Sequence, residues 1–314
     1  MPELPEVETT ARGLRSKVVG HTITDFWCDH ARMIRYISIP ALRKLVVGRK
    51  VVIARRRAKH VLIDLSGGKT LVIHMKMTGH LLYGKYSKIT NPKAQNSTKS
   101  QIWKAQGEGP LRDDPYNRFV HAIFVLDSPT SPRLRGARLC LAFSDMRKFG
   151  KIAIHDTHNI HTAKELEGLG PELWEIKARE FVKLMQSKKG RIKQVLMDQH
   201  TLAGVGNIYS DEALYLAGIH PLSQTNKLTN DKLLKLFRAL VSVTKKSFKT
   251  GGDSMSDYRN IDGVGGKFQN YHKVYGRKGL PCRKLNCKGM IERIIVAGRS
   301  AHFCPKHQKL YASN

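Results

Sequence analysis

The chain has 314 residues and a formal net charge of +30, from 55 Lys and Arg against 25 Asp and Glu. This length predicts two domains with cores of their own, and this charge makes a polyanion the expected partner. The sequence has no run of about 18 apolar residues that could cross a bilayer and no apolar stretch of a signal peptide, so we expect a cytoplasmic protein without membrane contact.

The first predicted element is a helix that begins near Pro5, because proline suits the first helical position. One helical face carries Val7, Ala11, Leu14 and Val18. Pro2 becomes the N-terminus if Met1 is removed, and its secondary amine is then a candidate nucleophile, since α-amino groups titrate at roughly 7.7 to 8.0. Glu3, the next residue, can move the accompanying protons. The alternative is that these residues only start the helix.

Short β-rich runs separated by turn signals follow this helix. They cover residues 51–55, 60–65, 70–75, 121–126, 138–143 and 151–155. This succession predicts an antiparallel β-sandwich. Residues 86–117 interrupt it with many Lys, Gln, Ser, Asn, Pro and Gly, so we expect an inserted surface loop there.

From about Ala163 the apolar residues recur at helical spacing. One stripe consists of Ala178, Phe181, Val182 and Met185, and a second consists of Leu233, Leu236, Phe237, Leu240 and Val241. The expected fold class is therefore α+β. We expect a β-sandwich domain over residues 1–157, a helical domain over residues 158–267 and a small appendix over residues 268–314.

A glycine-rich turn lies between two helical segments, where residues 202–209 read LAGVGNIY. Gly204 and Gly206 permit a tight turn, and the helix that follows presents N-terminal amides of the kind that bind phosphate. Asn207 can add a side-chain donor. An ordinary turn between helices is the alternative. The glycines do not continue into a dinucleotide fingerprint, so we expect no nucleotide cofactor.

Three of the five cysteines cluster near the C-terminus. Four residues lie between Cys282 and Cys287, sixteen between Cys287 and Cys304, and two between Cys304 and His307. Three thiolates and one imidazole can complete a tetrahedral zinc site, which is structural because no position stays open, so we expect one zinc ion. His302 competes for the fourth place, but its spacing from Cys304 fits a strand, which favours His307.

The opening PELPE resembles the signature of the formamidopyrimidine-DNA glycosylase family, base-excision enzymes also called MutM, and further matches recur along the whole chain. The resemblance implies a monomeric DNA glycosylase and AP lyase that removes oxidised purines from damaged double-stranded DNA. In the implied mechanism Pro2 displaces the base at the sugar C1′, Glu3 handles protons and Glu6 helps to organise the site. The resulting iminium then drives β- and δ-elimination.

The same resemblance assigns DNA contacts in both halves of the chain. Lys59 and Arg299 match residues that reach phosphates around the damaged nucleotide. Met77 and Phe149 match residues that fill and wedge the duplex, and Arg147 matches the residue that reads the orphaned base. Extruding a base costs a few kcal/mol, which such wedges offset.

Residues 202–209 resemble the helix-two-turn-helix element of this superfamily, and residues 282–307 its zinc-finger β-hairpin. Lys189, Lys193 and Asn207 match phosphate contacts. Glu172 matches a residue near the lesion, with helix capping as an alternative. Residues 251–254 and 257–268 resemble the segment that closes over a flipped oxidised purine. The 86–117 loop is longer than the family usually carries, and the family more commonly uses four cysteines at its zinc site.

Two other functions fit part of the pattern. An endonuclease VIII-like enzyme would use the same nucleophile on oxidised pyrimidines, but it generally has a shorter capping segment and a different opening tetrapeptide. A non-catalytic, zinc-bearing DNA-binding protein would explain the charge, the glycine-rich turn and the cysteines equally well. It would not explain Pro2 followed by Glu3.

Overall fold

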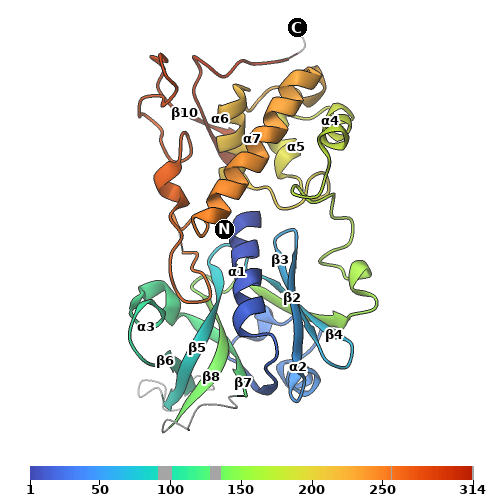
Figure 1. Ribbon diagram of the computed structural model, residues 1–314, viewed down its shortest axis with the longest axis vertical. Helices are drawn as coiled ribbons and strands as arrows, with labels where there is room; N and C mark the ends of the chain where they lie inside the picture. The colour runs from blue at the N-terminus through green and yellow to red at the C-terminus, as the bar shows by residue number, and fades with distance from the viewer. Residues whose placement is uncertain (91–100, 128–135, 256, 313–314) are drawn as a thin grey trace. The chain divides into compact units, whose positions relative to one another are not determined.

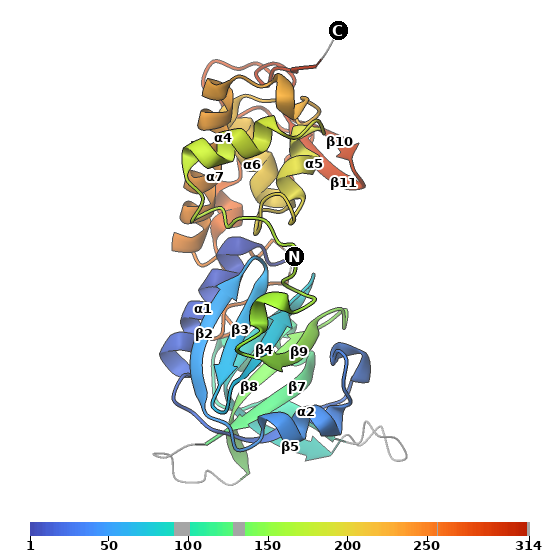
Figure 2. The same ribbon diagram turned by 90° about the vertical axis from the view of Figure 1, so that its right-hand side faces the viewer.

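The structure, a computed structural model, describes residues 1–90, 101–127, 136–255 and 257–312. The chain forms two compact units, shown in Figures 1 and 2: unit 1 is Met1–Glu167 with Gly251–Lys267, and unit 2 is Gly168–Thr250 with Phe268–Asn314. Residues 251–267 therefore group with the β-rich unit, whereas the sequence-based division placed them with the helices. No helix among the described residues is long and apolar enough to cross a membrane.

Unit 1 is a sandwich of two antiparallel sheets, as the strand pattern predicted. One sheet has the order β1-β7-β8-β5-β6 and the other the order β2-β3-β4-β9 (Figure 2). The strands are β1 (Ile23–Cys28), β2 (Val51–Arg57), β3 (His60–Leu65), β4 (Lys69–His74), β5 (Gly79–Thr90), β6 (Gln101–Ala105), β7 (Val120–Leu126), β8 (Ala137–Asp145) and β9 (Lys151–Asp156). Its helices are α1 (Leu4–Lys17), α2 (Ile39–Val46) and α3 (Pro110–Asp113), with 3-10 turns η1 (Ala31–Met33), η2 (Pro115–Arg118) and η3 (Ile160–Thr162).

The helix α1 is anchored by the apolar face that its sequence predicted. Its Val7, Ala11 and Leu14 are each 0% exposed, and α1 packs against β2 and β3. Phe124 and Phe143, from the other sheet, belong to the same core cluster as Val7 and Leu14. Because this core fixes α1, it also fixes the place of the residues just before the helix.

The segment 86–117 is not the surface loop that we expected, at least in its described part. The end of β5 pairs with β6, from Tyr86 opposite Ala105 to Thr90 opposite Gln101. Tyr86 is 0% and Trp103 5% exposed, and both belong to a second core cluster of unit 1. The polar composition hid this strand pair because its burial depends on a few aromatic residues. Residues 91–100 lie outside the described part of the chain.

Unit 2 is helical with a small hairpin, which completes the expected α+β class. Its helices are α4 (Ala178–Gln186), α5 (Ile192–Met197), α6 (Asn207–Ala217) and α7 (Asn230–Lys249), its 3-10 turns are η4 (Thr225–Lys227) and η5 (Phe268–Tyr271), and its strands are β10 (Glu292–Val296) and β11 (Arg299–Phe303). Helices α6 and α7 pack side by side (Figure 1). Both predicted stripes face the interior, as the burial of Phe181 and Leu236 shows.

A buried histidine makes the stability of unit 1 depend on pH. His80 is 1% exposed, and burial lowers its pKa to about 4 although its Nε2 hydrogen-bonds Asn117 Oδ1 (3.1 Å). An unfolded histidine titrates at about 6.5, so the unfolded chain binds more protons between these two values. The stabilisation is therefore complete above about pH 6.5 and is lost as the pH falls toward 4.

We expect the free energy of unfolding to fall by about 2 kcal/mol between pH 7 and pH 5 because of His80 alone. Urea unfolding of the wild type and of His80→Gln at both pH values measures this difference. The glutamine variant should lose less stability on acidification than the wild type does. An equal loss in both proteins would contradict the assignment.

Candidate functional site

The residues before α1 form a capped helix start. Proline stands in the first turn of α1, and Glu3 and Glu6 form a capping box. The Glu3 backbone N–H donates to Glu6 Oε2 (2.8 Å), and Glu3 and Glu6 are each 2% exposed. The structural alternative considered for this motif is thus present, and it leaves Pro2 at a fixed position immediately before the helix.

The segment 251–267 is attached to the same helix start. The Asp253 backbone N–H donates to Glu6 Oε1 (2.8 Å), and the Tyr258 hydroxyl donates to the Glu6 carbonyl (3.0 Å). Gly252 has φ +92°, and a Cβ there would lie 3.0 Å from Glu6 Cγ. Glu6 therefore connects the N-terminus to this segment with both carboxylate oxygens and its carbonyl, and glycine at 252 permits the approach.

Met77, Arg147 and Phe149 come together, although about 70 residues separate the first from the other two. Arg147 Nη1 lies 3.2 Å from Met77 Sδ, and its guanidinium carbon lies 4.7 Å from the centre of the Phe149 ring. Met77 is 36% and Phe149 46% exposed, so neither is a core side chain. We call these three residues the wedge cluster.

Asp145, which the sequence analysis did not identify, holds in place the two turns that carry the wedge cluster. It is fully buried and accepts hydrogen bonds from the Thr78 hydroxyl, from the Arg147 backbone N–H (3.2 Å) and from the Gly150 backbone N–H (2.7 Å). One carboxylate thus joins the turn after Met77 to the turn that carries Arg147 and Phe149. An acid at the end of a strand and just before a turn was the only available signal.

The N-terminus, the wedge cluster and the segment 251–267 lie near one another. Burial raises the pKa of the Asp257 carboxyl, and the N-terminal ammonium, Arg259 and Arg147 oppose this rise. These three cations come from three separate stretches of unit 1, and all act on one carboxyl. The Asp257 carboxyl is thus within electrostatic reach of the Met1 ammonium, of Arg259 and of Arg147.

Lys59 stands in the turn between β2 and β3, next to Ala58, which has φ +52°. The residue is 6% exposed, and its charge is one of those that lower the pKa of His74, after burial and the charges of His60 and Lys76. At this exposure Lys59 is not a freely solvated surface lysine.

In unit 2 the glycine-rich turn precedes α6 as predicted. Gly204 has φ +94°, and α6 begins at Asn207. Gln199 holds the turn, because its Nε2 donates to the Val205 carbonyl (2.8 Å) and its Oε1 accepts from the Gly204 N–H (3.0 Å). Sequence reasoning missed Gln199, since an isolated glutamine carries no pattern.

The other predicted DNA contacts of unit 2 differ in exposure. Glu172 is 5% exposed, and its backbone forms an isolated parallel β-bridge with Ala203 beside the glycine-rich turn. Lys189 is exposed. Lys193 is 0% exposed and forms an ion pair with Asp211, whose Oδ2 also accepts from the His302 backbone N–H (2.8 Å). This burial contradicts the expected phosphate contact of Lys193, because its ammonium is enclosed by protein groups.

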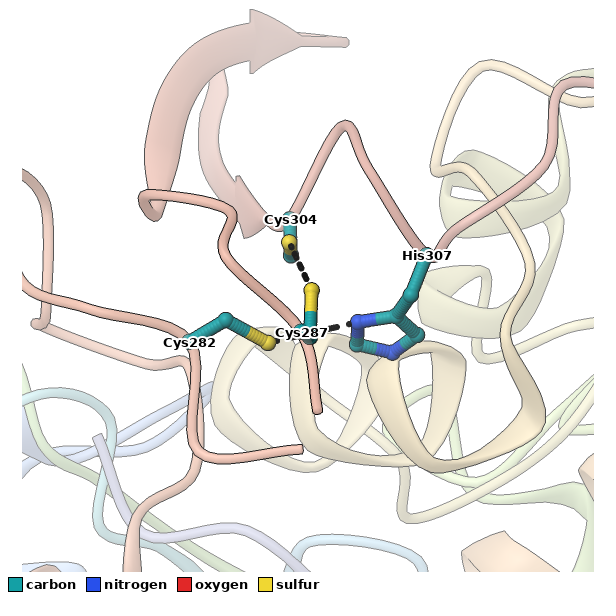
Figure 3. A group of neighbouring side chains, drawn as sticks. All are labelled: Cys282, Cys287, Cys304 and His307. Atoms are coloured by element: carbon teal, nitrogen blue, oxygen red, sulfur yellow. Dashed lines mark hydrogen bonds between the residues drawn. The ribbon is translucent and has the colours of Figure 1, made fainter. Parts of the chain in front are cut away.

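The four predicted zinc ligands converge in unit 2. Ligand atoms of Cys282, Cys287, Cys304 and His307 all lie within 4.8 Å of one another (Figure 3). Cys287 Sγ and Cys304 Sγ are 3.7 Å apart, and Cys282 Sγ and His307 Nδ1 are 3.4 Å apart. A zinc tetrahedron has edges of about 3.8 Å between sulfurs and about 3.6 Å between sulfur and nitrogen, so the donors fit this metal.

Neighbouring groups orient this cluster. His307 Nε2 donates to the Tyr215 carbonyl (3.0 Å), which leaves Nδ1 as the ligand atom, and the Tyr215 hydroxyl lies 3.1 Å from Cys282 Sγ. His302, the competing candidate, contacts Asp211 through Nδ1 (3.1 Å) instead. A Cβ on Gly289 would lie 2.5 Å from Cys304 Sγ, so only glycine leaves room for this sulfur.

Arg299 begins β11, directly after the two-residue turn of the hairpin. Ala297 and Gly298 have φ +48° and +72°, as hairpin turns of this length require, and Arg299 is exposed. The chain's last cysteine ligand, Cys304, follows the end of this strand. Metal binding and the position of Arg299 therefore depend on the same hairpin.

Known proteins match this chain over nearly its full length. The family profile described as the formamidopyrimidine-DNA glycosylase N-terminal domain matches residues 1–152, and the profile of the H2TH domain of the same glycosylase matches residues 168–259. The formamidopyrimidine-DNA glycosylase of Solibacter usitatus is 36% identical over 309 residues, which cover 98% of this chain and 100% of that protein. The protein of the same name from Herpetosiphon aurantiacus is 33% identical and covers 97% of this chain.

Two solved structures of the Lactococcus lactis Fpg are also similar. A variant in complex with a Fapy-dG-containing DNA aligns with a TM-score of 0.77 at 29% identity, covering 98% of this chain and 100% of that one. The complex of the Lactococcus lactis protein with an abasic-site-containing DNA aligns with a TM-score of 0.75 at 29% identity, covering 98% and 99%.

Proposed function

Because this chain belongs to the formamidopyrimidine-DNA glycosylase family, we propose that it excises oxidised purines from double-stranded DNA and then cleaves the abasic site. The observation that carries this proposal is that Glu6 joins the start of α1 to the segment 251–267 by direct hydrogen bonds, in the same unit that holds the wedge cluster. The net charge of +30 suits a nucleic-acid substrate. One similar Lactococcus lactis structure contains DNA with Fapy-dG, which supports the purine class, and another contains DNA with an abasic site, which supports the second reaction.

The nucleophile that we propose is the Pro2 nitrogen. Removal of Met1 turns this nitrogen from an amide into a secondary amine that is partly neutral near pH 8. The amine attacks C1′ of the damaged nucleotide, the C1′–N9 bond breaks, and the base leaves with a proton. Opening of the sugar ring at the C1′–O4′ bond then leaves an iminium between Pro2 and C1′.

Glu3 and Glu6 have different proposed roles in this step. Glu3 takes the proton that the amine loses and passes it to the departing base. A second proton, which Glu3 takes up from solvent, goes to O4′ as the ring opens, so the product is an alcohol and a cationic iminium. Glu6 touches no substrate in this account. It positions the Glu3 backbone and the Asp253 backbone through the two hydrogen bonds of its carboxylate (2.8 Å each).

Elimination at the two flanking phosphates follows. The iminium acidifies the C2′ proton, whose loss expels the 3′ phosphate, and a second proton loss expels the 5′ phosphate. We propose that Lys59 of unit 1 and Arg299 of unit 2 bind these phosphates as cations, which stabilises the charge of the leaving groups. In unit 2, the exposed Lys189 and the N-terminus of α6 at Asn207 are further proposed phosphate contacts, with Glu172 beside the same turn.

We propose that Cys282, Cys287, Cys304 and His307 hold one zinc ion. When bound, the ion cross-links the hairpin of β10 and β11 to the preceding loop. All four positions are filled by protein atoms, so the site is structural and takes no part in the reaction.

The wedge cluster explains how a base leaves the stack. We expect Phe149→Ala to slow excision of 8-oxoguanine about tenfold, because a wedge offsets part of the few kcal/mol of unstacking. Met146→Ala is the matched control, since Met146 is 44% exposed beside the cluster but is not part of it. Single-turnover cleavage of a lesion duplex measures both variants. Slow excision by Met146→Ala, or excision by Phe149→Ala at the wild-type rate, would contradict the wedge role of Phe149.

The substrate class is tested with three duplexes, which contain 8-oxoguanine opposite cytosine, thymine glycol, or no lesion. We expect rapid base release and strand cleavage on the first, little on the second and none on the third. Preference for thymine glycol would favour the endonuclease VIII-like alternative. Binding without cleavage of any duplex would favour the non-catalytic DNA-binding protein.

A further inference from the structure

The chain between β6 and β7 contains ordered structure that the proposed mechanism does not use. Residues 110–118, which we call the strut, comprise α3 and η2. Asp114 caps η2, because its carboxylate accepts a hydrogen bond from the Tyr116 backbone N–H (2.9 Å). The strut belongs to unit 1, as does the segment of residues 257–267, which we call the capping segment.

The strut contacts the capping segment through an ion pair. Arg259 Nε donates to Asp114 Oδ2 (2.6 Å), and the guanidinium carbon lies 4.6 Å from the centre of the Tyr116 ring. Arg259 is 9% exposed, and its Nη1 also donates to the Tyr258 carbonyl (2.8 Å). A cation this buried requires a partner charge, so the ion pair matters more here than an exposed pair would.

A second contact is an amide that bridges three parts of unit 1. Asn117 Nδ2 donates to the Gly263 carbonyl (3.1 Å) and to the Pro110 carbonyl (2.8 Å), while its Oδ1 accepts from His80 Nε2. Asn117 is 3% exposed. Its amide therefore fixes the turn of the capping segment at Gly263 to the strut and to strand β5.

Gly263 itself shows how close this approach is. The residue has φ +78°, and a Cβ there would lie 2.5 Å from Asn117 Nδ2 and 2.8 Å from Leu111 Cα. Backbone of the strut and backbone of the capping segment are thus in direct contact. The middle of the capping segment is also fixed to β5, because the Tyr83 N–H donates to the Ile261 carbonyl (2.7 Å).

The capping segment is therefore held from two sides. At its start, the Tyr258 hydroxyl donates to the carbonyl of Glu6, in the helix that follows Pro2. At Arg259 and Gly263 it is held by the strut. A segment with so many fixed hydrogen bonds has little freedom to rearrange, so less entropy is lost when it closes on a ligand.

We propose that the strut pre-orders the capping segment for binding a damaged base, and that Asp114 and Asn117 are positioning residues for lesion recognition. This inference rests on the proposed function. The inference predicts different effects on two reactions of the same enzyme, base excision and cleavage of a preformed abasic site. Excision requires the base to be held, whereas a preformed abasic site has no base for the capping segment to contact. Loss of the strut should therefore slow excision and leave abasic-site cleavage nearly unchanged.

The test compares Asp114→Ala and Asp114→Asn with the control Asp113→Ala. Asp113 is an acidic neighbour that pairs with Arg112 and accepts from the Gly109 N–H. Single-turnover cleavage is measured on an 8-oxoguanine duplex and on an abasic-site duplex, and hydrogen exchange of residues 257–266 is measured without DNA. For Asp114→Ala we expect about tenfold slower excision, abasic-site cleavage within about twofold, and faster exchange.

Asp114→Asn keeps an acceptor oxygen and should fall between the wild type and Asp114→Ala, while Asp113→Ala should match the wild type. Unchanged exchange, unchanged excision, or an equal loss on both duplexes would overturn the role of the strut. A wild-type protein that cleaves neither duplex would overturn the proposed function and this inference with it. Wild-type activity with unaffected Asp114 variants would overturn only the strut.

Discussion

Replacing Pro2 by glycine is expected to reduce strand cleavage at 8-oxoguanine by about a hundredfold or more. Glycine keeps an α-amino group but makes it a primary amine without the ring that fixes its direction. Loss of a nucleophile's positioning removes several kcal/mol of barrier lowering, which corresponds to a factor of this size. Single-turnover cleavage of a duplex with 8-oxoguanine opposite cytosine measures the change, after mass spectrometry has shown that Met1 is absent.

Pro5→Ala is the matched control for this variant. Pro5 stands in the first turn of α1, where alanine is well tolerated, and it carries no free amine. We expect its cleavage rate to stay within about threefold of the wild-type rate. A Pro2→Gly protein as active as Pro5→Ala would mean that the nucleophile is another group.

Replacing Cys304 by serine is expected to remove zinc and to unfold the hairpin. Zinc content, measured by mass spectrometry of the native protein, should fall from one ion per chain to none, because the thiolates and the imidazole bind as a set. DNA affinity should fall about tenfold or more, since the hairpin carries Arg299 and several charge contacts set the affinity. Circular dichroism measures the unfolding of the hairpin, and a fluorescence anisotropy titration measures the DNA affinity.

Cys28→Ser provides the control for the metal site. Burial raises the pKa of the Cys28 thiol to about 11, so this sulfur stays protonated and does not compete for metal. We expect this variant to keep its zinc and its DNA affinity. Zinc retained by Cys304→Ser, or lost from Cys28→Ser, would contradict the assigned ligand set.

Much of the fold follows from local pattern. The face of α1 and the stripes of α4 and α7 were predicted because one helical side of each is apolar, and these side chains are buried as expected. Strand β5 was missed because it begins at Gly79 and runs into polar residues. Its partner β6 is short, and the burial of Trp103 depends on residues far away in sequence.

The candidate site was only partly predictable. The cysteine spacing was enough to predict the metal cluster, since ligand type and spacing are chemically specific. The members of the wedge cluster were identified through the family resemblance, but their mutual contacts and their support by Asp145 join distant parts of the sheet, which no local pattern reveals. Lys193 was expected to contact phosphate, yet it is buried and its ammonium is bound by Ser210 and Asp211. A lysine's environment cannot be deduced from its type alone.

The segment 251–267 shows the same limit on the scale of a domain. It was matched to the segment that closes over a flipped purine and was placed with the helical domain, but nothing in the string indicated that it groups with the β-sandwich. That outcome depends on Glu6 in α1 and on Asp114 and Asn117 in the strut, which are two other stretches of the chain. Physical contacts of this kind appear only when the whole chain is folded.

The central claim is the covalent link between Pro2 and C1′, and borohydride trapping tests it most directly. Met1-free, zinc-loaded protein is mixed with an 8-oxoguanine duplex or an undamaged duplex, and borohydride reduces any iminium to a stable amine. We predict a protein–DNA adduct on the lesion duplex alone, with the modified sugar mapped to Pro2 by peptide mass spectrometry. No adduct, or an adduct mapped to a lysine, would contradict the account.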